Sequence, residues 1–323
     1  GGHQLCGILP ESISHEGYWA KPAHSYWDDI FALQGLSDAL TACRILKDAT
    51  ATGPNLQSAA PIATAQFDRL SAIYEEFKQA YLASIKHSMQ HHGIDFIPGA
   101  ADLGDSDATS VTVALDPGDV LMDALPSEVE RTFEHYWQYF CKRRDDQIAW
   151  TAYTPYEHRI VGTFVRLHQI DRAHALLDYF MQDRRPAGFN HWAEVVYRDR
   201  LHPGFVGDAP HGWVGSDFVR AVRSLFAYEH KGVLTLFGGV KDEWLAEGVC
   251  VDNLATHYGA VSVRAWTTSV GVSYQIQGEI AAPMRLRLPS GMRSVTADGV
   301  AVTPDCHGYV MVSPGSALVV ALY

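Results

Sequence analysis

Acidic and aromatic residues crowd the first thirty positions of the chain. The acidic residues are Glu11, Glu16, Asp28 and Asp29, and the aromatic ones are Tyr18, Trp19, Tyr26 and Trp27. Carboxylates before a helix are favoured by its unpaired N–H groups and its dipole, so Asp28 or Asp29 could simply cap the helix that follows. The density of carboxylates beside aromatic rings instead favours a site that binds a sugar.

A second segment with candidate catalytic residues runs from Phe189 to Tyr197. It continues into a Gly- and Pro-rich stretch that ends at His211-Gly-Trp213. Glu194 stands there next to Trp192-Ala193 and before two valines, an apolar setting that disfavours a charged carboxylate. The alternative to a catalytic role is an ion pair with Arg159, Arg184 or Arg185. His211 and Trp213 precede a helix and are expected to line a pocket floor, or only to stiffen the loop.

The third segment, 153–159, ends in Glu157-His158-Arg159. Glu157 and Arg159 are expected to pair across a helix start. The alternative is that Arg159 binds a hydroxyl or carboxylate of the substrate, because its planar guanidinium suits either group.

The spacing of His and Cys residues indicates no metal site. His87, His91 and His92 stand at positions i, i+4 and i+5, but no carboxylate accompanies them at metalloprotease spacing, and the five cysteines include no CxxC pair. There is no Gly-rich phosphate loop either, so we expect no cofactor.

These segments stand among helices that give way to strands. Apolar residues recur at helical spacing over 30–43, 67–85, 129–140, 160–167 and 216–226, and we expect Asp171 to cap a further helix. Residues 49–60 are expected to form a loop, and Pro61 to begin a helix. Beyond residue 231 the pattern changes to period two over 261–266, 270–275, 284–288 and 318–322, which predicts antiparallel strands. We therefore expect a helical domain over 1–231 and a small antiparallel β-sandwich over 232–323.

Composition excludes several classes of protein. The 323 residues are 47% hydrophobic and carry a formal net charge of −12, which argues against a nucleic-acid partner. No apolar stretch is long enough to predict a membrane span.

The order of these motifs resembles the six-hairpin glycosidases, whose relatives include inverting trehalases and α-L-rhamnosidases. The resemblance rests on Tyr26-Trp27-Asp28-Asp29 at a helix start, then Trp192-Ala193-Glu194, a Gly-rich loop, His211-Gly-Trp213 and a β-sandwich. It implies an (α/α)6 toroid, with Asp28 as general acid and Glu194 as general base. Asp29 and Glu16 remain alternatives for the acid. The predicted helices are fewer than a closed ring needs, so we expect an N-terminal part of the same parent protein to complete it. The resemblance also implies a periplasmic or extracellular location.

The expected activity is hydrolysis of a glycosidic bond with inversion, which requires two carboxyl groups about 6.5–9.5 Å apart. The residues expected to bind the sugar are Tyr18, Trp27, Arg159, Trp192, His211 and Trp213. A sugar epimerase is the first alternative, because the chain has sixteen His residues, with His15, His24, His191 and His211 as candidates. A non-catalytic carbohydrate-binding scaffold is the second.

Overall fold

The computed structural model describes residues 5–13, 21–52, 60–184, 188, 190–202, 209–314 and 318–323. The chain divides into two compact units, residues 1–148 and 149–323. Each unit has a core of its own and is described separately.

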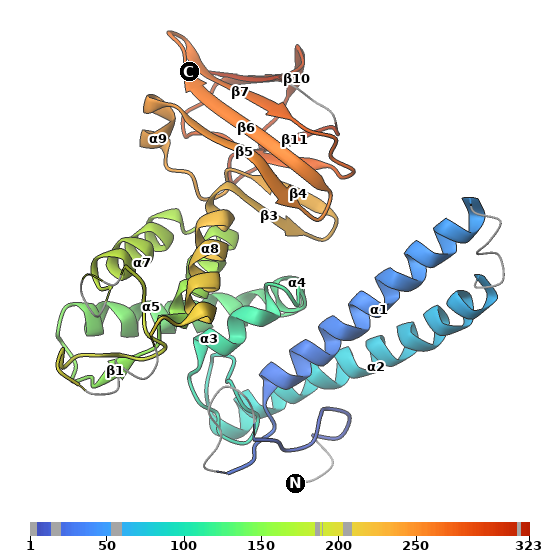
Figure 1. The fold of residues 1–323 in the computed structure, drawn as a ribbon, viewed down its shortest axis with the longest axis vertical. Helices are drawn as coiled ribbons and strands as arrows, with labels where there is room; N and C mark the ends of the chain where they lie inside the picture. The colour runs from blue at the N-terminus through green and yellow to red at the C-terminus, as the bar shows by residue number, and fades with distance from the viewer. Residues whose placement is uncertain are drawn as a thin grey trace. The chain divides into compact units, whose positions relative to one another are not determined.

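The first unit is built from helices. Its two long helices, α1 (Tyr26–Thr52) and α2 (Ala60–His92), pack against each other, as Figure 1 shows. The shorter helices are α3 (Ala108–Val111), η2 (Thr112–Ala114), α4 (Leu121–Ala124) and α5 (Pro126–Arg144). Tyr26, Ile30 and Leu33 of α1 are buried, as are Tyr81 and Ile85 of α2. Because these residues recur every three or four positions, they form one apolar face on each helix.

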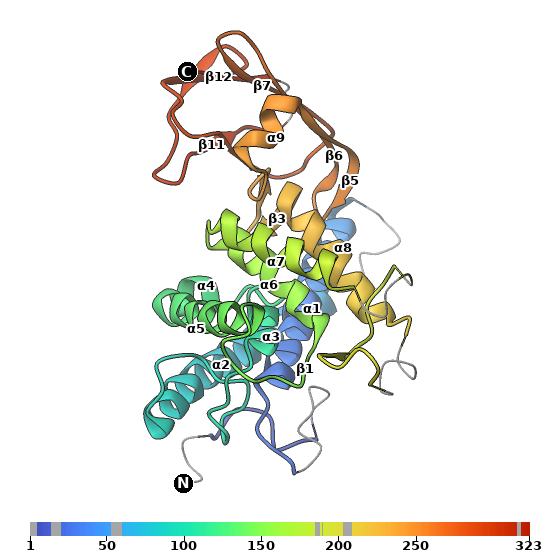
Figure 2. The ribbon, with the colours of Figure 1, turned by 90° about the vertical axis from the view of Figure 1, so that its left-hand side faces the viewer.

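The second unit begins with a short ladder and three helices. Strand β1 (Ala152–Tyr153) pairs antiparallel with β2 (Val196–Tyr197). Between them lie η3 (Pro155–Glu157), α6 (His158–Arg166) and α7 (Ile170–Gln182), and α8 (Gly212–Phe226) follows β2. Helix α6 packs against both α7 and α8, and the three are seen together in Figure 2. Gly162 permits this, because a Cβ atom there would lie 3.0 Å from the Ser224 hydroxyl of α8.

Two sheets complete the second unit as a β-sandwich. One has the strand order β10-β9-β12-β7-β6-β5 and the other β11-β8-β4-β3. Their bounds are β3 (Ala227–His230), β4 (Val233–Leu236), β5 (Val249–Thr256), β6 (Gly259–Thr267), β7 (Gly271–Gln277), β8 (Met284–Arg287), β9 (Ser294–Ala297), β10 (Val300–Val302), β11 (Tyr309–Val312) and β12 (Leu318–Leu322), with α9 (Asp242–Glu247) between β4 and β5. Alternate residues of both sheets, such as Leu234 and Leu236 of β4 and Val261 and Val263 of β6, fill one shared core.

The prediction of helices followed by strands is confirmed, with four corrections. Helix α1 runs to Thr52, so the start of the loop predicted over 49–60 is helical, and residues 53–59 lie outside the described chain. Asp171 lies in the first turn of α7, whose N-cap is Gln169. The sandwich is not wholly antiparallel, because β4 and β8 pair parallel. Strands also begin earlier than predicted, since β3 follows α8 directly at Ala227. In the described part of the chain, no helix is both long and apolar enough to cross a membrane.

Candidate functional site

The predicted site residues fall into two groups, one in each unit. Asp28, Asp29 and Trp27 belong to the first unit, and Glu194 belongs to the second with Arg159, Trp192, His211 and Trp213. Glu16 and Tyr18 lie outside the described residues. The acid and base candidates are therefore described each in its own surroundings.

The first group stands at the beginning of α1, where the chain before the helix folds back over it. Ser12 and Ala23 form an isolated antiparallel bridge, and Ser25 forms another with Ala100. The Ser12 hydroxyl donates to the Asp28 carboxylate, and the Leu9 N–H donates to Asp29 Oδ1 at 2.9 Å. Both carboxylates thus hold the segment at 9–12 in place, in addition to their favourable position at the positive end of the helix.

Asp28 and Asp29 differ in burial although they are neighbours. Asp29 is 1% exposed and its Oδ2 atom has no hydrogen-bond partner, whereas Asp28 is partly exposed. Burial raises the pKa of Asp29 to about 7, the Leu9 N–H opposes this rise, and the charge of Asp28 adds to it. Below about pH 7, Asp29 is therefore a buried carboxyl that holds its proton, and Asp28 is the one that solvent can reach.

Trp27 lies in the core of the first unit. Its side chain is 6% exposed, and its ring lies 4.9 Å from that of Phe31. The structure thus places Trp27 as a packing residue beside the two carboxylates.

The second group is assembled around Tyr156 by the β1–β2 ladder. Ala152 pairs with Tyr197 and Tyr153 with Val196, which brings the chain after β1 next to the chain before β2. The Thr154 side chain then accepts from the Tyr156 N–H and starts the 3-10 turn η3. We call Tyr156, Arg159, Glu194, His211 and Trp213 the Tyr156 cluster.

The Tyr156 hydroxyl joins Glu194 to His211. It donates to Glu194 Oε1 at 3.1 Å, and it lies 2.8 Å from His211 Nε2. A tyrosine has one hydroxyl proton, so His211 must carry its own proton on Nε2 when Tyr156 donates to the carboxylate. Glu194 is partly exposed, and its described hydrogen bond goes to this tyrosine and not to Arg159 or Arg184. Arg185 lies outside the described residues.

Arg159 covers the aromatic side of the Tyr156 cluster. Its guanidinium carbon lies 4.5 Å from the Tyr156 ring centroid and 5.5 Å from that of Trp213. Its Nε donates to Asp217 Oδ2 of α8 at 2.8 Å, and both side chains are largely buried. This ion pair anchors α6 to α8.

Trp192 supports the cluster from the core. It is 4% exposed, donates from Nε1 to the Phe180 carbonyl at 2.9 Å, and packs on the ring of His158 at 4.5 Å. His158 is fully buried, and its Nδ1–H donates to the Pro155 carbonyl at 2.7 Å. Burial lowers the pKa of His158 to about 4, against the effect of that hydrogen bond. His158 is therefore neutral at physiological pH and acts as one ring of an aromatic box.

Sequence reasoning missed the roles of Tyr156, Asp217 and His158. Tyr156 stands in the segment that was singled out, but its position at the hub depends on the pairing of two strands, each only two residues long. Asp217 lies in the second turn of α8, where its sequence context does not single it out. Its position four residues after Trp213, one helical turn further on, was the signal in the sequence that could have placed it near the candidate site.

Comparison with known proteins leaves the family open: no protein-family model matches the chain, and no curated protein sequence is significantly similar to it.

Proposed function

We propose that the chain is a glycoside hydrolase that acts with inversion, with Glu194 as its general base. The observation that carries this proposal is the Tyr156 cluster, where a partly exposed carboxylate is oriented by a tyrosine among aromatic rings and a guanidinium. Aromatic faces pack on sugar rings, and fixed polar groups orient the hydroxyls. A general base also needs solvent access, since it must take a proton from water.

The general acid in this proposal is Asp28. An acid has to touch the glycosidic oxygen, and Asp28 is partly exposed whereas Asp29 is 1% exposed. Asp29 then acts as a positioning residue, because its carboxyl holds Leu9 next to the start of α1. Glu16 remains the alternative acid. We further propose that the helices of the chain belong to an (α/α)6 toroid, the fold in which inner helix ends surround one cavity.

The test is a screen of chromogenic glycosides with the wild-type chain and the Glu194→Gln variant. Glutamine keeps the size of the side chain and an acceptor for Tyr156, but it cannot deprotonate water. We expect kcat to fall by about 10³-fold, within the range for removing a general base. The matched control is Glu243→Gln, an exposed glutamate of the same unit, which should hydrolyse at the wild-type rate. Wild-type turnover by Glu194→Gln, with an unchanged circular dichroism spectrum, would contradict the assignment.

A sugar epimerase is the second candidate, favoured by the position of His211. Tyr156 lies within hydrogen-bond distance of both His211 and Glu194, so three groups able to carry a proton meet at one point. Such a set suits proton exchange at a carbon atom. Deuterium from solvent would enter an unhydrolysed sugar in an epimerase, and not in a hydrolase. Sugar binding that survives both Glu194→Gln and Asp28→Asn, without turnover in any form, would instead indicate a carbohydrate-binding scaffold.

A further inference from the structure

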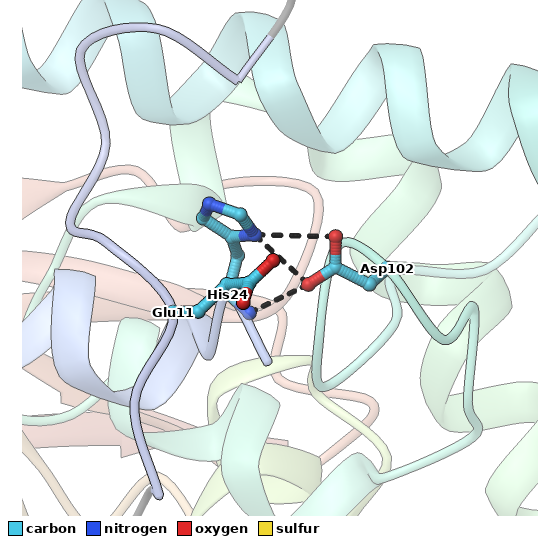
Figure 3. A group of neighbouring side chains, drawn as sticks. All are labelled: Glu11, His24 and Asp102. Atoms are coloured by element: carbon cyan, nitrogen blue, oxygen red, sulfur yellow. Dashed lines mark hydrogen bonds and ion pairs between the residues drawn. The ribbon is translucent and has the colours of Figure 1, made fainter. Parts of the chain in front are cut away.

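Three side chains that suit a metal ion meet near the start of α1. One ligand atom from each of Glu11, His24 and Asp102 lies within 4.8 Å of the other two. The three residues come from separate segments, and Figure 3 shows their side chains pointing toward one another. They are 13 and 78 residues apart in sequence, so no local motif reveals them.

Backbone pairing on both sides fixes the positions of these residues. Glu11 directly precedes Ser12, which bridges to Ala23, and His24 directly follows Ala23. His24 also stands before Ser25, which bridges to Ala100, and its carbonyl accepts from the Ala101 N–H at 2.9 Å. Asp102 follows immediately. Two isolated β-bridges therefore hold three ligands within one site, which lowers the entropic cost of binding an ion there.

The charges in this group also favour a cation. The Asp102 carboxylate lies 2.9 and 3.1 Å from His24 Nδ1, and it accepts the His24 backbone N–H at 2.7 Å. Glu11 adds a second carboxylate at the same point, and like charges so close repel each other. Lys21 contributes only a longer-range charge to Asp102. A divalent ion would relieve this repulsion.

We propose that Glu11, His24 and Asp102 bind a divalent transition-metal ion, with Zn²⁺ as the ion to test. One imidazole nitrogen favours zinc over calcium or magnesium, which prefer all-oxygen sites. Three protein ligands leave a fourth position for water, as in open zinc sites. The side chains of His24 and Asp102 are 18% and 33% exposed, so solvent can reach that position.

Binding requires a change of tautomer at His24. In the metal-free pair, Nδ1 carries the proton that Asp102 accepts. For Nδ1 to bind the ion, the ring has to carry its proton on Nε2 instead. The ion then replaces the hydrogen bond between His24 and Asp102 and links three segments, those of Glu11, His24 and Asp102. Because Glu11 and His24 precede α1 in the chain, the metal would fix the segment that Asp28 and Asp29 also hold.

Isothermal titration of the metal-stripped full chain with ZnCl₂ tests the site, and CoCl₂ provides a second readout through its visible absorption bands. We expect one ion per chain from this site. Glu11→Gln and Asp102→Asn should each weaken binding at least about tenfold. Glu11→Gln is the sharper variant, because it leaves the His24–Asp102 pair intact and a purely structural hydrogen bond would not respond to it.

The matched control is His91→Gln, which removes a histidine from the His87–His91–His92 group on α2. These histidines also offer ring nitrogens to zinc, so the variant separates their contribution from that of Glu11, His24 and Asp102. Binding that persists in Glu11→Gln and Asp102→Asn but is lost in His91→Gln would overturn the proposal, and so would the absence of binding by the wild-type chain. The titration needs no substrate, so its outcome is independent of the glycosidase proposal.

Discussion

The two carboxylate groups of this protein are built by different means. At the start of α1, Asp28 and Asp29 are held by a serine hydroxyl and a backbone N–H from a segment that folds back over the helix. In the Tyr156 cluster, Glu194 is held by a tyrosine hydroxyl, and the surrounding order comes from packed rings. The first arrangement buries Asp29, whose pKa is raised to about 7, and leaves its neighbour Asp28 partly exposed. The second leaves Glu194 within reach of water.

The largest expected effect tests whether the two groups act on one substrate. If Asp28 and Glu194 are the acid and base of one reaction, removing either removes most of the catalysis, so their effects do not add. We expect Asp28→Asn and Glu194→Gln each to lower kcat by about 10³-fold, and the double variant to be little slower than the worse single variant. Rates on one chromogenic glycoside provide the measurement. Losses that multiply in the double variant would show that the two groups work separately.

The next effect separates Asp29 from its neighbour through pH. An unfolded chain ionises Asp29 above its ordinary pKa of 3.8, whereas the folded chain keeps the proton up to about 7. The folded state is therefore destabilised as pH rises through this range, by up to about 4 kcal/mol. In Asp29→Asn this loss should disappear, which urea unfolding at pH 4.5 and 8.5 can detect. The exposed Asp68→Asn is the control, and it should retain the wild-type dependence.

His158 should produce the opposite pH dependence in the second unit. Its pKa of about 4 in the folded chain lies below its ordinary value of 6.5, so the unfolded chain binds the proton first as pH falls. The stability that a neutral His158 contributes is present above pH 6.5, and up to about 3 kcal/mol of it is lost on the way to pH 4. His158→Phe should remove this slope while keeping a ring in the box. If the free energy of unfolding of His158→Phe kept the wild-type dependence on pH between 4 and 6.5, the ring of His158 would be hydrated in the folded chain.

The smallest effect concerns the hydroxyl that orients Glu194. Tyr156→Phe keeps the ring under Arg159 and removes only the hydrogen bonds to Glu194 and His211. We expect a loss of stability of about 1 kcal/mol, as for a single hydrogen bond, and a lower kcat with little change in KM. Thermal unfolding and steady-state rates measure the two. A change in KM alone would mean that the tyrosine binds substrate instead of positioning the carboxylate.

Local periodicity allowed the longer helices and the strands β6, β7, β8 and β12 to be predicted, because each depends on residues close together in sequence. The spacing of Leu33 and Leu40, or of Val261 and Val263, reports one buried face directly. The parallel pairing of β4 with β8 was not predictable in this way, since β5, β6 and β7 of the other sheet lie between them in sequence. This pairing depends on contacts between residues that are far apart in sequence and meet only when the two sheets pack together.

The site was predictable only as separate segments. Glu194, His211 and Arg159 were recognised by residue type, but their meeting point at Tyr156 follows from the β1–β2 ladder. The contrast between Asp28 and Asp29 could not be predicted either, because adjacent acids in one helical turn differ only in which side of the helix is covered. The approach of Asp102 to His24 likewise depends on the bridge between Ser25 and Ala100.

The direct passage from α8 into β3 has a mechanical consequence. Phe226 ends the helix and Ala227 begins the strand, so no loop residue separates β3 from α8. A helix of fifteen residues is about 22 Å long and stiff. A small tilt of the sheet would therefore shift His211, the N-cap at the far end of α8. A ligand that binds the sandwich and tilts this sheet would therefore move His211, which lies next to Tyr156 and Glu194, through α8.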